Sequence, residues 1–262
     1  IRSGIFPSVG GTRRPGTTVL IEDVAFPLKE LPEATADLQE LLVTNEYHDA
    51  CIYGHALEGN FHFIISQSFD SPEQVARYEK LMDEVKTLVV DKYDGSLKAE
   101  HGTGRNMAPF VKYEWGERAY GFMKAVKELF DPKGLLNPGV IFNEDPHCHL
   151  KHFKPMPLTN AHVDKCIECG FCEVNCLTCG FSLSSRQRIV IQREISRLKK
   201  LSDTESSERL KTLQKQYKYL GNATCAGDGL CSMSCPMGIN VGDLTHDIRQ
   251  ANLPEKSIGY KT

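Results

Sequence analysis

The first part of the chain alternates short apolar runs with segments of helical periodicity. Residues 17–21, 50–56 and 61–66 are rich in β-branched and aromatic side chains and predict strands. Apolar residues recur at helical spacing over residues 31–45, after the start signal Ser71-Pro72, and over residues 110–130. Helices and strands mixed in this order predict an α+β domain over residues 1–145.

The pattern changes after residue 145. Residues 146–164 are rich in proline and lack periodicity, so we interpret them as a linker. The histidines of this linker are expected to be solvated rather than to bind metal: His147, His149 and His152. Two helical segments follow among clustered cysteines, near residues 191–198 and 202–220, and predict an all-α domain over residues 165–262.

Composition and charge exclude several classes of protein. The 262 residues are 40% hydrophobic and 25% charged, which excludes a disordered or fibrous chain. A formal net charge of −3 gives no electrostatic reason for nucleic-acid binding. No apolar run approaches the roughly 20 residues of a membrane-spanning helix, and no signal peptide opens the chain. We therefore expect a cytoplasmic protein.

Two further features bear on partners and completeness. Residues 186–218 hold ten Lys or Arg against four Asp or Glu, a local charge of +6. Such a stretch is a solvated face or, alternatively, a docking surface for an acidic partner or for anionic lipid, peripherally on the inner membrane. The chain begins at Ile1 rather than at a methionine, so we expect a fragment or a processed piece.

The cysteines carry the most specific spacing. Eight of the ten lie between Cys166 and Cys235, and the first run has the 2-2-3 spacing of bacterial two-cluster ferredoxins: Cys166, Cys169, Cys172 and Cys176. The reciprocal run contains Cys225, Cys231 and Cys235, followed by Pro236. In such proteins three thiolates of one run hold a 4Fe-4S cubane, and the distant fourth cysteine completes the other cluster. Zinc is the alternative for closely paired cysteines, but this spacing favours iron–sulfur.

The second cysteine run departs from the usual pattern. Asp228 occupies the place of its middle cysteine, and Cys179 is a spare thiol three residues after Cys176. One interpretation is that Asp228 is a loop residue and that Cys179 only packs. The other is that Cys225, Cys231 and either Cys176 or Cys179 hold a weaker centre, with three irons or with oxygen ligation, because a carboxylate is a harder ligand than a thiolate.

A histidine hairpin is the other candidate for chemistry. A two-residue turn at Glu58-Gly59 would place His55 directly opposite His62, close enough for both imidazoles to reach one ion. Glu100, in a glycine-rich stretch, would complete a facial set of ligands. The alternative is a pair of structural histidines.

Three motifs of the chain resemble one enzyme family. They are GHALEGNFH at 54–62, EHGTGR at 100–105 and DPKGLLNPG at 131–139. They resemble the C-terminal half of FAD-linked oxidases, whose close kin are D-lactate and other D-2-hydroxyacid dehydrogenases of the vanillyl-alcohol-oxidase flavoprotein superfamily. The cysteine run from Cys166 resembles the ferredoxin tail of some members. The resemblance implies a ferredoxin-like α/β sandwich that caps the substrate, followed by a ferredoxin-type domain.

The resemblance also implies roles for individual residues. A divalent ion, zinc or manganese, would be held by His55, His62 and Glu100 and would bind the carboxylate and hydroxyl oxygens of the substrate. His101 would be the base that takes the hydroxyl proton while hydride leaves C2 for FAD. Asn60 would orient the ligands or the substrate.

Two assignments lie outside the ligand motifs. Asn137 would lie near the flavin. An arginine would pair with the substrate carboxylate, and Arg2 is the first candidate for this role. The alternatives to Arg2 are Arg13, Arg14 and Arg105. The FAD-binding half of the family precedes this region, and no glycine-rich pyrophosphate loop is found here. We therefore expect this piece alone to bind flavin poorly and to be inactive.

The combined features predict part of a flavin- and iron–sulfur-dependent dehydrogenase. Its substrate would be a D-2-hydroxy acid, foremost D-lactate, oxidised to pyruvate. Electrons would pass from FAD through the clusters to a quinone, a cytochrome or an electron-transfer protein. The alternatives are glycolate oxidation by the same machinery and a non-catalytic iron–sulfur subunit that only transfers electrons.

Overall fold

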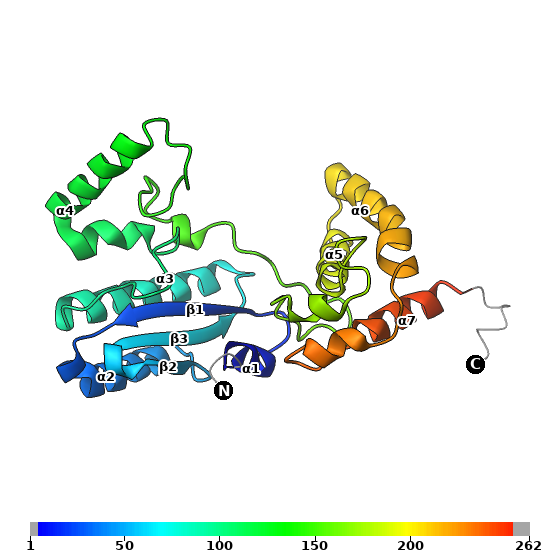
Figure 1. Cartoon of the computed structure of the whole chain (residues 1–262), viewed down its shortest axis with the longest axis horizontal. Helices are drawn as coiled ribbons and strands as arrows, with labels where there is room; N and C mark the ends of the chain where they lie inside the picture. Colours follow the sequence, from blue (N-terminus) through cyan, green and yellow to red (C-terminus); the bar gives the residue numbers. More distant parts are fainter. Residues whose placement is uncertain (1–4, 254–262) are drawn as a thin grey trace. The chain divides into compact units, whose positions relative to one another are not determined.

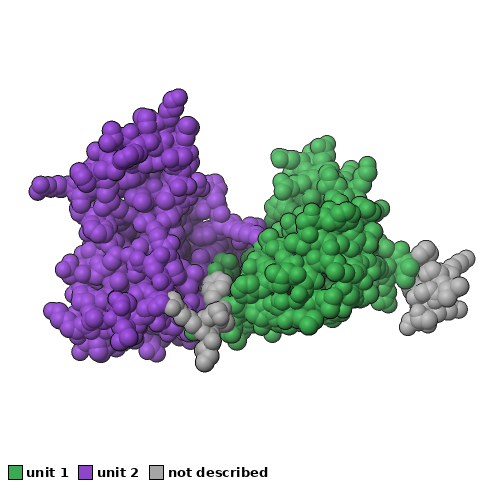
Figure 2. All heavy atoms as spheres, viewed as in Figure 1, with its two compact units in different colours: residues 1–19, 156–262 green, residues 20–155 purple. Residues whose placement is uncertain are grey.

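The computed structural model describes residues 5–253, which form two compact units (Figure 2). One unit comprises residues 20–155, and the other combines residues 1–19 with residues 156–262. Helices and a small sheet are mixed in the described fold (Figure 1), which confirms the predicted α+β class.

The 20–155 unit is built on a three-stranded sheet in the order β1-β3-β2, with β1 Thr18–Ala25, β2 Cys51–His55 and β3 Asn60–Gln67. Its helices include α2 Leu31–Thr44, α3 Pro72–Lys86 and the π-helix Thr87–Lys92. Phe61, Phe63 and Ile65 alternate along β3 and share one apolar core with Leu38 of α2 and Tyr78 of α3. The helices therefore cover one face of the sheet.

The β2–β3 hairpin differs in register from the predicted one. A four-residue connection, with a 3-10 turn over Ala56–Glu58 and Gly59 at φ 69°, pairs His55 with Asn60 instead of His62. The predicted two-residue turn is therefore wrong. Because the register moves by two residues, the alternation of faces is preserved. His55 and His62 still lie on one side of the sheet, with ring centroids 5.8 Å apart.

Helix α4 (Ala108–Phe130) bends at Gly116, whose φ of 73° and ψ of 165° are not helical. Its second half and the following turn expose large apolar side chains: Phe122, Leu129, Phe130, Leu135 and Leu136. Asp131 closes this turn by accepting the backbone N–H groups of Leu135 and Leu136, both at 2.9 Å. Asn137 follows directly, exposed and at φ 46°.

The first residues of the predicted linker pack against the 20–155 unit. The 3-10 helix Cys148–Leu150 contains His149, which is only 8% exposed and lies 5.1 Å from the Phe110 ring. Burial lowers the pKa of His149. The expectation of a solvated imidazole is therefore wrong for His149, because this side chain packs in the protein. His147 and His152 are exposed, as expected.

Between residues 156 and 253 the second unit is helical, and no strand is described in that range. Its helices are α5 Ser185–Leu198, α6 Thr204–Tyr217, the π-helix Lys218–Ala223 and α7 Val241–Ala251. Two 3-10 helices, Phe171–Asn175 and Leu230–Ser234, carry cysteines and contact each other. This arrangement confirms the ferredoxin-type helical domain. None of the described helices is long and apolar enough to cross a membrane.

The start of the chain also belongs to the second unit, which the sequence pattern did not indicate. Helix α1 (Ile5–Thr12) is followed by Arg13, which is 2% exposed. The Arg13 guanidinium donates to the carbonyl oxygens of Lys165 and Cys166 at 2.8 and 2.9 Å. Arg13 therefore fixes the loop that leads into the first cysteine run.

Candidate functional site

Strand alternation places polar side chains on the sheet face opposite the helices. Asn60 and His62 alternate with the core residues of β3, and Asp23 lies on the neighbouring strand β1. Asp23, Asn60 and His62 are 0%, 5% and 2% exposed. Buried polar groups need partners within the protein, so this face is built around a polar cluster.

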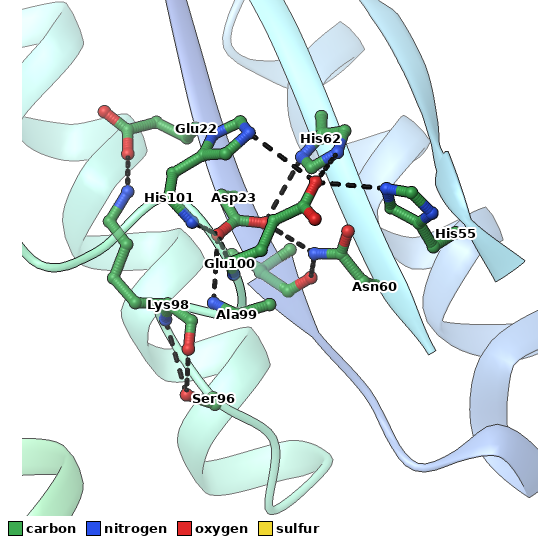
Figure 3. Close-up of polar contacts among 11 residues, drawn as sticks. Glu22, Asp23, His55, Asn60, His62, Ser96, Lys98, Ala99, Glu100 and His101 are labelled. Atoms are coloured by element: carbon green, nitrogen blue, oxygen red, sulfur yellow. Dashed lines mark hydrogen bonds and ion pairs between the residues drawn. The ribbon is translucent and has the colours of Figure 1, made fainter. Parts of the chain in front are cut away.

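Asp23 shapes the loop that carries Glu100 and His101 (Figure 3). Its Oδ2 accepts the backbone N–H groups of Ala99, Glu100 and His101 at 3.0, 2.7 and 2.8 Å. Burial alone would raise the pKa of Asp23, but these bonds and one from the Asn60 amide hold it below its usual range. Three successive N–H groups on one oxygen bend the loop, and this bend directs the Glu100 side chain toward the sheet.

The loop brings Glu100 to the two hairpin histidines. Glu100 Oε1 lies 3.1 Å from His55 Nε2 and 3.0 Å from His62 Nε2. The three candidate ligand atoms all lie within 4.8 Å of one another. Atoms that bind the same zinc ion, each at a distance of about 2.0–2.2 Å, lie about 3–4 Å from one another. Two imidazoles and a carboxylate in this arrangement therefore fit a divalent ion.

A second group of candidate ligands shares His62 and consists of Asp23, His62 and His101. Asp23 is fully buried, and both of its oxygens already accept hydrogen bonds. An ion bound to Asp23 would compete with the bonds that position Glu100. The Glu100 side chain, in contrast, is 46% exposed and accessible to a ligand. The geometry therefore favours the set of His55, His62 and Glu100.

The two ring nitrogens of His62 have different surroundings. Nδ1 lies 3.2 Å from Asp23 Oδ1, and Nε2 faces Glu100. The Asp23 carboxylate favours the proton on Nδ1, which leaves the lone pair of Nε2 for a metal ion. Burial and the neighbouring His101 lower the pKa of His62, which favours the neutral ring, the form that binds a metal ion.

His101 lies beside this ligand set. Its ring stacks on His62 with centroids 4.5 Å apart and an interplanar angle of 5°. Its Nε2 lies 3.8 Å from Glu100 Oε1, and its side chain is 37% exposed. An accessible imidazole next to an ion site can reach a proton of a bound substrate.

The other predicted site residues lie differently. Asn60 is buried and donates to Asp23 Oδ1 and to the Val24 carbonyl oxygen, so it supports Asp23 from behind the ligand set. Asn137 lies in the exposed turn after α4, and no hydrogen bond joins it to the described ligand set. Arg2 lies outside the described residues.

Two buried acids of β1 were missing from the sequence prediction, Asp23 and its neighbour Glu22. Glu22 is 3% exposed, accepts from Lys98 Nζ at 2.8 Å and also accepts from the Asn106 amide. It therefore anchors the start of the loop that Asp23 bends. A signal was present, because two adjacent acids interrupt an otherwise apolar strand and buried acids require partners.

The cysteines of the second unit form two groups. Cys176, Cys225 and Cys231 line one cavity, together with Asp228. In the other group, Cys172 lies near Cys166, Cys169 and Cys235, and it also lies near Cys231 of the cavity. Cys235 of the second run therefore lies with the three thiols of the first, and Cys176 of the first run lies with those of the second.

The spacing of the thiols bears on which metal they suit. Among the described residues, no three cysteine Sγ atoms lie within 4.8 Å of one another. Four sulfurs that bind the same zinc ion, each at a distance of about 2.3 Å, would all lie within 4.8 Å of one another. Thiolates of an iron–sulfur cluster bind different iron atoms and need not lie so close together.

Asp228 and Cys179 are placed differently around the cavity. Asp228 lines it, and its Oδ1 also accepts the Leu230 N–H at 3.1 Å. Cys179 is exposed and is not among the lining residues. This arrangement favours Cys176 over Cys179 as the third thiolate of the cavity.

Cys166 and Cys176, one cysteine from each group, differ in electrostatic surroundings. Burial raises the pKa of Cys166 to about 11. Burial also acts on Cys176, but hydrogen bonds with Thr178 and the charge of Arg188 hold the pKa of this thiol below its usual value. The Cys176 thiolate is therefore formed more easily than that of Cys166.

Comparison with known families decides the classification. Residues 1–141, more than half of the chain, match the family described as FAD linked oxidases, C-terminal domain. The chain belongs to this family. Residues 162–239 of the chain match the 4Fe-4S dicluster domain. The resemblance carried by the three motifs and the cysteine spacing is thus confirmed.

Several similar proteins are oxidases or dehydrogenases of hydroxy acids by name. The chain is 27% identical to glycolate oxidase subunit GlcD of Bacillus subtilis (strain 168) over 128 residues, 49% of this chain and 27% of GlcD. It is 30% identical to the probable mitochondrial D-lactate dehydrogenase of Danio rerio, over 49% of this chain and 25% of that protein. It is 33% identical to D-2-hydroxyglutarate dehydrogenase of Stutzerimonas stutzeri (strain A1501), over 46% and 26% of the two chains. The matched region spans about a quarter of the length of these relatives.

The position of Asp228 gives a first prediction. We expect the cavity of Cys176, Cys225 and Cys231 to hold a three-iron centre, seen by electron paramagnetic resonance of the oxidised protein, because a carboxylate binds iron more weakly than a thiolate. Asp228→Cys should convert this centre to a cubane. Cys179→Ser is the control and should leave the spectrum unchanged. Two equally stable cubanes in the unmutated protein would contradict the assignment.

Proposed function

We propose that this chain is the substrate-cap and electron-transfer part of an enzyme that oxidises D-2-hydroxy acids, foremost D-lactate to pyruvate. The carrying observation is the set of His55, His62 and Glu100 with the accessible His101 beside it. The names of similar proteins, which include D-lactate and D-2-hydroxyglutarate dehydrogenases, support this reaction class. FAD, bound outside the described residues, would accept hydride from C2 of the substrate.

The arrangement of the ligand set suits a 2-hydroxy acid. A divalent ion bound there would attract the carboxylate and the hydroxyl oxygen of the substrate and lower the pKa of the hydroxyl. The two imidazoles and the Glu100 carboxylate would hold one face of the site, and the opposite side would remain open to substrate. Asp23 and Asn60 would keep this face rigid from the buried side of the sheet.

His101 would move the proton. Its ring is fixed in orientation by stacking on His62, while part of its surface remains accessible. A neutral imidazole is a competent base for a hydroxyl whose pKa is lowered. The proton would pass from the substrate hydroxyl to His101 as the hydride leaves C2.

Two alternative functions would use parts of this arrangement. Glycolate carries the same carboxylate and hydroxyl groups, and the similarity to GlcD favours glycolate as an alternative substrate. A non-catalytic electron-transfer subunit would use only the iron–sulfur unit. For the enzyme, the acceptor would be a quinone, a cytochrome or an electron-transfer protein. A further proposal is peripheral membrane contact through the exposed basic residues of 186–218, without Arg188 and Arg193, which are buried.

Metal analysis of the purified protein separates the enzyme from the carrier. We expect iron, sulfide and about one equivalent of zinc or manganese per chain, because His55, His62 and Glu100 form a complete facial set. His62→Ala should lose the zinc or manganese and keep the iron. His152→Ala, at an exposed histidine of the linker, is the control and should keep both. Iron and sulfide without a further divalent ion would favour the carrier.

A further inference from the structure

Arg188 is a buried cation in the iron–sulfur unit. It lies in the first turn of α5 and is 1% exposed, less than almost any charged side chain in a folded protein. A guanidinium removed from water requires a full set of hydrogen bonds and a nearby negative charge. The hydrogen bonds of Arg188 show where that charge lies.

Three of the four described hydrogen bonds that Arg188 donates go to neutral oxygens. Its Nε donates to the Gly221 carbonyl oxygen at 2.7 Å, and Nη2 donates to the hydroxyls of Thr178 and Thr224 at 3.0 Å each. The remaining bond joins Nη1 to Cys176 Sγ at 3.7 Å. None of these hydrogen bonds involves a carboxylate. Among the described hydrogen-bond partners of Arg188, the Cys176 sulfur is therefore the one that becomes anionic when a cluster is assembled.

The other cysteine group has a different charge balance. Arg193 lies on the same helix and is also buried, but its Nη1 is 2.6 Å from Glu168 Oε1. Arg13 donates to main-chain carbonyl oxygens in the same loop, and Asp164 and Glu168 lie near it. Carboxylates thus accompany the arginines around Cys166. At Cys176 one carboxylate, Asp228, lines the same cavity as Arg188, but the described hydrogen bonds of Arg188 go to Gly221, Thr178, Thr224 and Cys176 and none goes to Asp228.

We propose that the charge of Arg188 is balanced by the cluster that Cys176 helps to hold, and that Arg188 raises the reduction potential of this cluster. An electron added to the cluster brings a further negative charge next to a fixed positive one, which favours the reduced form. The N–H···S hydrogen bond acts in the same direction. Arg188 thus acts on the electron through the cluster that Cys176 helps to hold.

The step itself is a one-electron reduction. In the proposed enzyme the electron comes from the hydroxy acid through FAD, and the cluster passes it to the acceptor. In the test, dithionite supplies the electron, so the result does not depend on the proposed substrate. The inference rests on the dicluster assignment, and it can fail while the proposed dehydrogenase function stands.

A redox titration of the whole iron–sulfur-loaded protein tests the proposal. Both clusters are followed by electron paramagnetic resonance, and Cys176→Ser identifies the signal of the cluster in question. Arg188→Gln should lower the reduced-to-oxidised ratio of that cluster about tenfold at a given potential, or about 59 mV for one electron. The other cluster should keep its potential. Arg186→Gln is the matched control, because Arg186 is partly exposed on the same helix and pairs with Glu173.

Arg188→Lys separates charge from packing. Lysine keeps the positive charge but loses the planar hydrogen-bonding geometry, so we expect a potential close to that of the unmutated protein. If Arg188→Gln cannot be loaded with iron, Arg188→Met, which also removes the charge and keeps the alkyl stem, takes its place. An unshifted potential in Arg188→Gln with full iron content, equal shifts of both clusters, or a tenfold shift in Arg188→Lys would overturn the proposal.

Discussion

His101→Ala, in the enzyme assembled with its FAD-binding part, should lower turnover at least about a hundredfold and leave the divalent ion bound. His101 stacks on His62 and lies 3.8 Å from the Glu100 carboxylate, beside the ligand set. Its removal would take away a proton acceptor and no ligand. Steady-state turnover with D-lactate and metal content of the same sample are the two measurements.

Substitution of a candidate ligand histidine should have the opposite effect on the divalent ion. His55→Ala should lose the divalent ion, because His55 Nε2 is one of the three atoms that meet at the site. His48→Ala changes an exposed histidine just before the same hairpin and is the matched control. If His101→Ala released the ion while His55→Ala retained it, the ion would bind at the group of Asp23, His62 and His101 instead.

The hairpin shows why the sequence predicted the site better than the turn. The motif contains a glycine, and the strand pattern indicates a hairpin, but the number of loop residues depends on the local backbone of Ala56–Glu58. The actual register differs from the predicted one by two residues, so both histidines keep their face of the sheet. A shift of one residue would have separated them.

Asp23 could not be assigned from the sequence because its role depends on distant parts of the chain. Its partners at Ala99, Glu100 and His101 lie more than seventy positions away, with separations of 76, 77 and 78 residues. Local patterns identify a strand there, but not which loop will cover it. The candidate cysteine ligands were easier to recognise, since short spacings place several thiols on one loop whatever the surrounding fold.

Arg188 and His149 illustrate a second limit of sequence patterns. Both belong to residue types that are usually exposed or half-exposed, yet they are 1% and 8% exposed here. Helical periodicity identifies the apolar residues that form the buried face of α5. The sequence pattern does not distinguish an arginine buried on this helix from one exposed to solvent. The tertiary partners, Gly221 and Thr224 for Arg188, come from a different part of the chain.

Asp23→Asn should be among the most disruptive conservative changes in the 20–155 unit. Both oxygens of Asp23 accept hydrogen bonds, from three backbone N–H groups on one side and from the Asn60 amide on the other. An amide has one acceptor atom, so either orientation of the new side chain sets an N–H group against other donors. We expect a loss of about 3 kcal/mol in the free energy of unfolding, because buried donors lose a charged partner.

The same change should also weaken the ion site. Without the carboxylate, the bend that presents Glu100 loosens and His62 Nδ1 loses its neighbour, so affinity for zinc or manganese should fall about 10- to 100-fold. Denaturant unfolding and titration with the metal measure the two effects. Asp49→Asn is the matched control, since Asp49 accepts from Ser66 Oγ at 2.8 Å on the exposed surface of the same hairpin; it should change stability by less than about 0.5 kcal/mol. Equal metal affinity in Asp23→Asn and Asp49→Asn would show that Glu100 is positioned without Asp23.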